Sequence, residues 1–365
     1  MKIARIMVAE CKIPLPKPIK LGPVLVTTRD FVAIRAVCDD GSFGDAIGYP
    51  RGSALFDEVV AVAPYFSKAN VMQRRAFTET AKGRQVNTLA SVGRALSLYE
   101  IAMADIFAKA MQQPWYSLIG GLRREVPVMA VAGYYLEARG IDDVVREVEQ
   151  LFDKGYKRAK IMLGGHDPEF DLRYASAVSA IAPHKIAADA HWSWKTHTEA
   201  LATTQRLDDL GLVFLEDPFG AHRNDQLKRL SNSLKTPLAA GEDMTSVTAL
   251  LALVPSVGYL RVDGTTAGGL TAAMAASEAA GALGIAVLPH VFPSLHAQVA
   301  GACPAVEMIE YIPQSTGADP VGLLLEREPK IIDGQWQIDQ EPGSGMALNW
   351  RGVQEYSVRS ETIEF

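Results

Sequence analysis

The chain is poor in cysteine, has no excess of positive charge and contains no long, strongly apolar segment. Its three cysteines, Cys11, Cys38 and Cys303, are far apart and form no CxxC pair. This excludes a disulfide framework and favours a reducing, cytoplasmic location. The net charge of −6 argues against nucleic acid or an anionic membrane as the main partner. Residues 264–289 carry one charge, Glu278, but their Ala, Gly and Thr predict a buried helix and strand, not a membrane span.

The N-terminal third has the pattern of a small sheet followed by helices. The first 60 residues alternate apolar and polar positions, and Asp40-Gly41 indicates a hairpin turn. Residues 15–29 and 49–54 are rich in turn-forming residues and are predicted to be loops. Residues 87–112 have the periodicity of a long helix. We expect a capping domain over residues 1–125, on which residues 320–365 fold back.

From about residue 127, short apolar runs alternate with amphipathic helices. The runs are AVAGYY, RAKIML, KIAADAHW, LVFLED, TPLAAGED, GYLRVD, IAVLPH and AVEMIEY. Eight strands separated mostly by helices predict an α/β protein with a parallel (β/α) barrel, here over residues 126–319. No GxGxxG follows the first strand, which disfavours a dinucleotide-binding sheet.

Polar residues end nearly every one of these runs, at intervals of 20 to 29 residues, about one β/α unit. In chain order they are Lys160, Asp189, Glu216, Glu242, Asp263, His290 and Glu310. In a parallel barrel the carboxyl ends of the strands converge on one mouth, where active sites lie. The spacing therefore predicts that these side chains face each other.

Three of these residues, Asp189, Glu216 and Glu242, are carboxylates on successive strands. A lone acidic residue at a strand end is usually a helix cap or a solvated loop charge. Three brought together repel, so their charge must be compensated. An all-oxygen set suits Mg²⁺ or Mn²⁺ better than Zn²⁺. From the residues alone, the metal site and the solvated charges are equally supported.

Several longer motifs resemble a known family. The segments ALSLYEIAMADIFAKAMQQPWYSLIGG, FLEDPF, GED, VDGTTAGGLT and LPHVF are similar to those of the enolase superfamily, specifically its mandelate racemase-like subgroup. The resemblance runs over nearly the whole chain. It implies a modified (β/α)₇β barrel of the TIM type with an α+β N-terminal capping domain. It also implies a homo-oligomer, since members are mostly oligomeric.

The same resemblance assigns roles to the strand-end residues. It implies that the three carboxylates hold one Mg²⁺ per subunit and that the metal binds a substrate carboxylate. His290 is implied to be a general base paired with Asp263, and Lys160 and Glu310 to face the substrate. The chemistry is reasonable, because a proton next to a carboxylate is weakly acidic and needs cations to stabilise the charge that its removal creates.

The first departure from the family pattern lies at Lys160-Ile161-Met162. Many members have Lys-x-Lys there, and the second lysine is a base on one face of the substrate. Met162 cannot transfer a proton, which argues against a two-base racemisation. The alternative is a shifted alignment in which Lys157 or Lys160 is the base. Period-2 alternation disfavours Lys157, which would point to the opposite side from Lys160.

The second departure is His191, two residues after Asp189 and therefore on the same side of the strand. Many relatives have Asn there, whereas members similar to galactonate and mannonate dehydratases have Asp-x-His, and that histidine is thought to help the 3-hydroxyl leave. The alternative is that His191 packs in the loop beside Trp192 and Trp194.

Together these features predict a Mg²⁺-dependent dehydratase that converts a small sugar acid, an aldonate or aldarate, into a 2-keto-3-deoxy acid. The alternatives are an epimerase, racemase or cycloisomerase on a carboxylate, and a catalytically silent sugar-acid-binding protein. Lys20, Tyr49 and Arg51 in the capping loops, with Trp192 at the barrel rim, are candidate substrate contacts. The alternative for the three loop residues is that they are solvated, and the alternative for Trp192 is that it fills the barrel rim.

Overall fold

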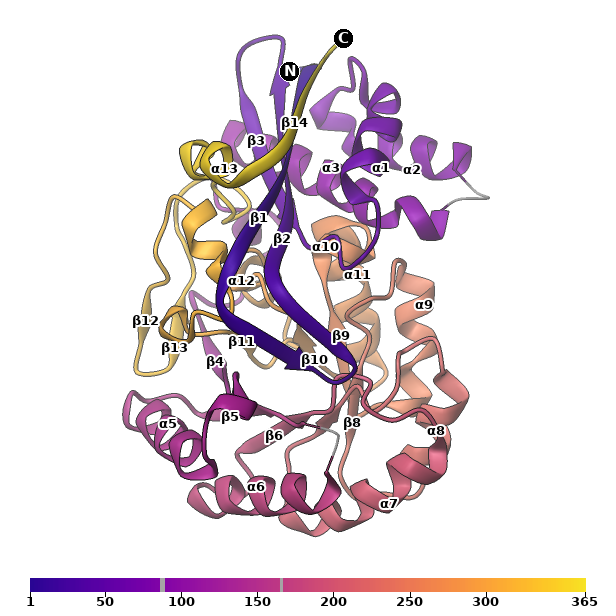
Figure 1. Cartoon of the computed structure of the whole chain (residues 1–365). Helices are drawn as coiled ribbons and strands as arrows, with labels where there is room; N and C mark the ends of the chain where they lie inside the picture. Colours follow the sequence, from indigo (N-terminus) through magenta and orange to yellow (C-terminus); the bar gives the residue numbers. More distant parts are fainter. Residues whose placement is uncertain (86–88, 165–166) are drawn as a thin grey trace.

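The computed structural model describes residues 1–85, 89–164 and 167–365. An antiparallel sheet and a parallel barrel make up the described chain (Figure 1). The antiparallel sheet has the order β14-β1-β2-β3. Its strands are β1 (Ile3–Leu21), β2 (Val24–Cys38), β3 (Phe43–Gly48) and β14 (Ser357–Glu364).

The hairpin of β1 and β2 is much longer than its sequence suggests, and it reaches from the antiparallel sheet to the mouth of the barrel (Figure 1). The turn at Asp40-Gly41 is confirmed between β2 and β3. The loop expected at residues 15–29 is wrong, because most of it continues β1 and β2. Proline is tolerated there because β14 pairs with β1 only as far as Cys11, which leaves one edge of β1 free beyond it. The register shifts between Pro14 and Ile19.

Helices follow β3 in the chain, and the first and third of them pack against this sheet. They are α1 (Leu55–Val62), α2 (Arg74–Arg84), α3 (Leu89–Ala110) and α4 (Trp115–Leu118). The expected helix over 87–112 is α3, and the first two positions of that range lie outside the described residues. Helix α3 contacts β3 as well as α10 and α11 of the barrel, so it joins the two parts of the molecule.

All eight expected barrel strands are present and parallel. They are β4 (Glu125–Ala132), β5 (Arg158–Met162), β6 (Ile186–Asp189), β7 (Leu215–Glu216), β8 (Leu238–Ala240), β9 (Tyr259–Val262), β10 (Ala286–Pro289) and β11 (Ile309–Tyr311). Strand β11 pairs with β4, and a bridge between Val287 and Val306 closes the ring. The connecting helices are α5 (Ile141–Asp153), α6 (Pro168–Ile181), α7 (His197–Leu207), α8 (Asn224–Ser231), α9 (Val247–Ala252), α10 (Gly264–Ala267), α11 (Gly269–Ala282) and α12 (Pro293–Ala300).

The last part of the chain contacts both sheets. Strands β12 (Ile331–Ile332) and β13 (Gln335–Gln337) pair with each other, and β13 extends the barrel sheet at β4. Helix α13 (Trp350–Tyr356) precedes β14, which pairs with β1. The division of the chain into domains at residues 125 and 319 stays a prediction. Within the described ranges, every helix is too short or too polar to cross a membrane.

Candidate active site

A buried ammonium group lies where four of the predicted strand-end residues meet. Lys160 Nζ lies 2.8 Å from Glu216 Oε2, 3.0 Å from Asp189 Oδ2 and 2.5 Å from Glu310 Oε1. Each of these four residues is at most 4% exposed. Asp189 and Glu216 end their strands, and Lys160 and Glu310 lie one or two residues before the ends of theirs, so the barrel alone brings the four together. The structure therefore brings together the ends of β5, β6, β7 and β11, as the spacing predicts.

Arg261 of β9 is a second buried cation, and the sequence analysis missed it. Its Nε donates to Glu216 Oε1 at 2.7 Å, and a terminal nitrogen bonds Glu310. Its other nitrogen donates to two backbone carbonyls, at 2.9 and 3.0 Å. The available signal was period-2 alternation, because Arg261 precedes Asp263 by two residues and points to the same side of the sheet.

These two cations set the charge state of the surrounding carboxyl groups. Burial favours protonation of Glu310, but Arg261 and Lys160 outweigh it and lower its pKa. Glu310 is therefore an ionised acceptor here, and it also accepts a bond from the Val291 amide at 3.1 Å. Burial raises the pKa of Glu216 to about 7 in spite of the same two cations.

The third predicted metal ligand, Glu242, follows β8 and is 4% exposed. Its Oε1 accepts a hydrogen bond from Arg51 at 2.7 Å. Its Oε2 lies 3.3 Å from His290 Nε2. Glu242 thus lies between a residue of the capping part and the predicted base.

The chemistry of Asp189, Glu216 and Glu242 fits a hard divalent cation, since all donors are buried carboxylate oxygens. Throughout the described ranges, no three His, Cys, Asp or Glu side chains are already arranged as a metal cluster. The three carboxylates bond cationic side chains instead. Asp217, beside Glu216, has a buried Oδ1 with no hydrogen-bond partner. Burial and the neighbouring carboxylates raise its pKa, so the cluster carries an excess of negative charge that a bound cation would reduce.

His290 and Asp263, at the ends of neighbouring strands β10 and β9, form a hydrogen-bonded pair. His290 Nδ1 lies 3.0 Å from Asp263 Oδ2. An ionised carboxylate only accepts, so Nδ1 carries the proton and Nε2 is free to face Glu242. Thr265 holds the other oxygen of Asp263 through its amide and hydroxyl, each at 2.7 Å. The ring is therefore oriented as a base requires.

His191 and Trp192 lie directly after β6 in a conformation that side chains rarely adopt, with φ of 42° and 60°. Their rings stack with centroids 4.5 Å apart. Trp192 Nε1 donates to Asp217 Oδ2 at 3.0 Å, which fixes the indole. Such strained residues persist when surrounding contacts hold them, and they concentrate at functional sites.

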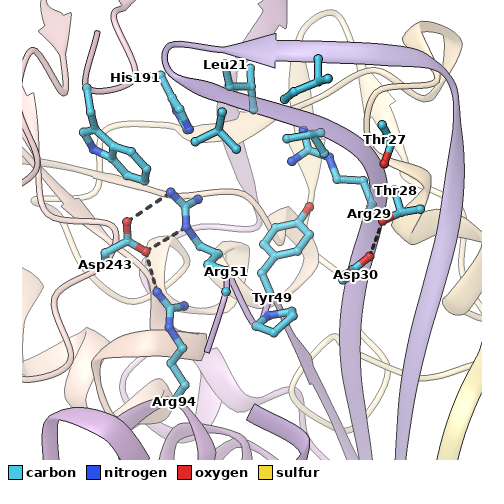
Figure 2. A pocket seen from close by; sticks show the side chains of 16 residues that line it. Leu21, Thr27, Thr28, Arg29, Asp30, Tyr49, Arg51, Arg94, His191 and Asp243 are labelled. Atoms are coloured by element: carbon cyan, nitrogen blue, oxygen red, sulfur yellow. Dashed lines mark hydrogen bonds and ion pairs between the residues drawn. The ribbon is translucent and has the colours of Figure 1, made fainter. Parts of the chain in front are cut away.

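Two of the spaces at the mouth of the barrel share part of their lining. The inner chamber, of about 40 Å³, is lined by Lys160, Asp189, Glu242, His290 and Glu310 among others. The outer cavity, of about 590 Å³, lies between the β1–β2 hairpin and the barrel rim (Figure 2). The hairpin tip is close to the rim: a Cβ added at Gly22 would lie 2.1 Å from the His191 carbonyl oxygen.

Of the four predicted substrate contacts, the structure brings three to these cavities and leaves Lys20 outside them. Tyr49 lines both spaces and packs between Phe31 and Phe292, and Trp192 lines the outer cavity. Arg51 also lines both, but it forms ion pairs with Glu242 and with Asp243. Lys20 is not brought to the site. It lies between buried Ile19 and Leu21, so the alternation of the strand turns it outward into solvent.

Comparison with known proteins identifies the family of the chain. Residues 143–352 match the family described as "Enolase C-terminal domain-like". The chain belongs to the enolase superfamily. An arabinonate dehydratase from Saccharolobus solfataricus is 26% identical over 73% of this chain and 72% of its own. An N-succinyl-L-Arg/Lys racemase from Bacillus cereus is 22% identical over all of both chains. The structure of L-talarate dehydratase from Polaromonas sp. JS666, complexed with Mg and L-glucarate, has a TM-score of 0.86 and 20% identity, and it covers 100% of this chain and 99% of that one.

The structure also shows where Met162 lies, the residue at which the sequence differs from the expected Lys-x-Lys pattern. Met162 is 5% exposed and lines the inner chamber, two residues after Lys160. Lys157 is exposed to solvent at the start of β5, so a shifted alignment does not bring it to the chamber. A non-titrating side chain therefore lines the inner chamber two residues after Lys160.

Proposed function

We propose that this protein is a Mg²⁺-dependent acid-sugar dehydratase, which removes water from an aldonate or aldarate to give a 2-keto-3-deoxy acid. The observation that carries the proposal is the His290–Asp263 pair, whose free Nε2 faces a chamber that contains Lys160 and three carboxylates. The similarity to an arabinonate dehydratase supports the choice of substrate class.

Asp189, Glu216 and Glu242 would hold the metal, whose double positive charge would neutralise the substrate carboxylate and acidify the neighbouring C–H bond. The Mg in the structure of the Polaromonas dehydratase supports this choice of ion.

His290 Nε2 takes the proton from C2, and Asp263 keeps the ring oriented and stabilises its charged form. Lys160 supplies a positive charge beside the substrate carboxylate, where negative charge develops as the proton leaves. Burial lowers the pKa of His290, but Glu242 and Asp263 outweigh burial and raise it above 6.5. A base must be neutral, so turnover rises with pH as His290 loses its proton.

Elimination also requires an acid for the leaving 3-hydroxyl. His191 lines the inner chamber, and burial lowers its pKa below 6.5, with Arg51 and Lys160 acting in the same direction. Only the imidazolium form of its ring can give a proton to the hydroxide-like leaving group, and the lowered pKa makes that form a stronger acid but a smaller fraction of the protein at neutral pH. Met162 offers no second base, which favours elimination over a two-base racemisation.

The test is a comparison of variants with stereoisomeric aldonates and aldarates in D₂O. His290→Asn should abolish exchange of the C2 hydrogen, and Asp263→Asn should reduce it by less, because Asp263 moves no proton itself. Wild-type exchange by His290→Asn refutes the proposed base. Recovery of an epimer in place of a keto acid supports the racemase or epimerase alternative, which the Bacillus cereus relative represents. Binding of sugar acids without any exchange supports a silent binding protein.

A further inference from the structure

The inner chamber and the outer cavity have one wall in common. Leu21, Arg29, Tyr49, Arg51 and His191 line both spaces. The inner chamber, at about 40 Å³, has room for a few water molecules but not for a whole sugar acid. A substrate whose reacting end is at Lys160 and His290 must therefore extend past this shared wall.

Two cations, Arg51 and Arg29, stand on that wall, and they differ in their partners. Arg51 bonds Glu242 at 2.7 Å and Asp243 at 2.9 Å, and Figure 2 shows it directed at Asp243. Its charge is thus already compensated. Arg29, from β2, forms no ion pair with any residue in the described part of the chain.

Arg29 is nevertheless held in place. Its Nε donates to the Ala318 carbonyl at 2.8 Å, and its guanidinium lies 5.9 Å from the centroid of the Tyr49 ring (Figure 2). Asp319 is the buried carboxyl group near it, but it lies beyond ion-pair distance of Arg29. Asp30, the next residue along β2, accepts a hydrogen bond from Thr28 instead. The terminal nitrogens of Arg29 are therefore available to a ligand, at little entropic cost for ordering the side chain.

We infer that Arg29 binds a second anionic group at the far end of the substrate, which makes this protein selective for dicarboxylic sugar acids, the aldarates. The guanidinium fork matches the geometry of a carboxylate, and such charge-assisted bonds are strong. An aldonate presents a hydroxymethyl group at this end and cannot form an ion pair there. The inference rests on the proposed function, because it takes the reacting carboxylate to be at Lys160.

The experiment measures binding by isothermal titration calorimetry with Mg²⁺ present, using the full-length His290→Asn protein to prevent turnover. The probes are pairs of equal stereochemistry: galactarate and galactonate, mannarate and mannonate, glucarate and gluconate. In the preferred pair, the aldarate should bind about 10- to 100-fold more tightly than the aldonate. Adding Arg29→Gln should remove that preference by weakening aldarate binding far more than aldonate binding, and Arg29→Lys should restore part of it.

Lys20→Gln is the matched control, because it removes the same charge from the same hairpin at an exposed position outside both cavities, and it should keep the preference. Equal affinity for both members of every pair, or equal weakening of both by Arg29→Gln, overturns the inference. If wild-type protein dehydrates aldonates but shows no aldarate preference, the role of Arg29 fails and the proposed function stands. If wild-type protein neither binds nor dehydrates any of these acids, the proposed function itself fails.

Discussion

Replacing Arg261 by Met should destabilise the folded protein strongly, and bound metal should reduce that loss. Arg261 is fully buried and bonds Glu216, Glu310 and two backbone carbonyls. Methionine fills a similar volume but offers no positive charge and no donor. The change thus leaves two buried carboxylates with only Lys160 as their cationic partner.

The expected loss of unfolding free energy follows from the two carboxylates that no longer have Arg261 as a partner. Removing one partner of a buried ion pair typically costs about 3–5 kcal/mol. Lys160 still lies 2.8 Å from Glu216 and 2.5 Å from Glu310, so we expect the lower end of that range, about 3 kcal/mol. With a urea slope of about 3 kcal/mol/M, the unfolding midpoint should fall by about 1 M.

The measurement is urea unfolding followed by circular dichroism, in EDTA and in saturating Mg²⁺. The loss should be smaller in Mg²⁺, because a metal on Glu216 would replace part of the missing positive charge. Arg206→Met is the control, since Arg206 pairs with Glu169 at the surface and should give no measurable change. A loss below about 1 kcal/mol for Arg261→Met in EDTA, or the same loss in EDTA and Mg²⁺, would refute the reasoning.

Three further predictions concern individual carboxyl and imidazole groups. Glu216→Gln should abolish Mg²⁺-dependent activity, and EDTA should do the same to wild type; full activity in EDTA from metal-free protein contradicts the metal site. His191→Asn should slow release of the keto acid about 10²–10⁴-fold, while C2 exchange of an analogue without the 3-hydroxyl continues; near-normal dehydration would make His191 a packing residue. Burial raises the pKa of Asp208, but the amides of Lys235 and Thr236 outweigh it and lower the pKa below 3.8. The difference in unfolding free energy between wild type and Asp208→Asn should therefore be constant above about pH 5 and shrink as pH falls below 4. A difference in urea midpoint that does not change with pH contradicts this.

The barrel was predictable because its signal is local and repeated. The barrel inferred from the short apolar runs and the superfamily inferred from the longer motifs are both confirmed. The path of the β1–β2 hairpin was not predictable. The prolines, lysines and glycine of residues 15–29 indicate a loop, and they become strands because the two arms of this local hairpin pair with each other, as Ile19 does with Val26. Pairing between strands outweighs composition in this region.

The difference between a local sequence signal and a contact made by folding also explains which site residues the sequence indicates. Asp189 and Glu216 end their strands, where the fold fixes the meeting point, and Lys160 belongs to the tripeptide that the family resemblance singled out. Arg261 was missed because it is not the residue that ends its apolar run, and Arg29 because it was assigned to a loop. Arg261 reaches the site within the barrel, and Arg29 reaches it only through the approach of the hairpin.

The pairing of β14 with β1 also bears on the order in which the molecule can be completed during synthesis. Strand β1 leaves the ribosome well before residues 357–364, with which its outer edge pairs. Until then the growing chain exposes an unpaired edge on β1, the kind of template that promotes association between chains. The exposed charges of Lys12 and Arg5 on that strand oppose association between chains before β14 has paired with β1. Closing the sheet is therefore a late, long-range folding step.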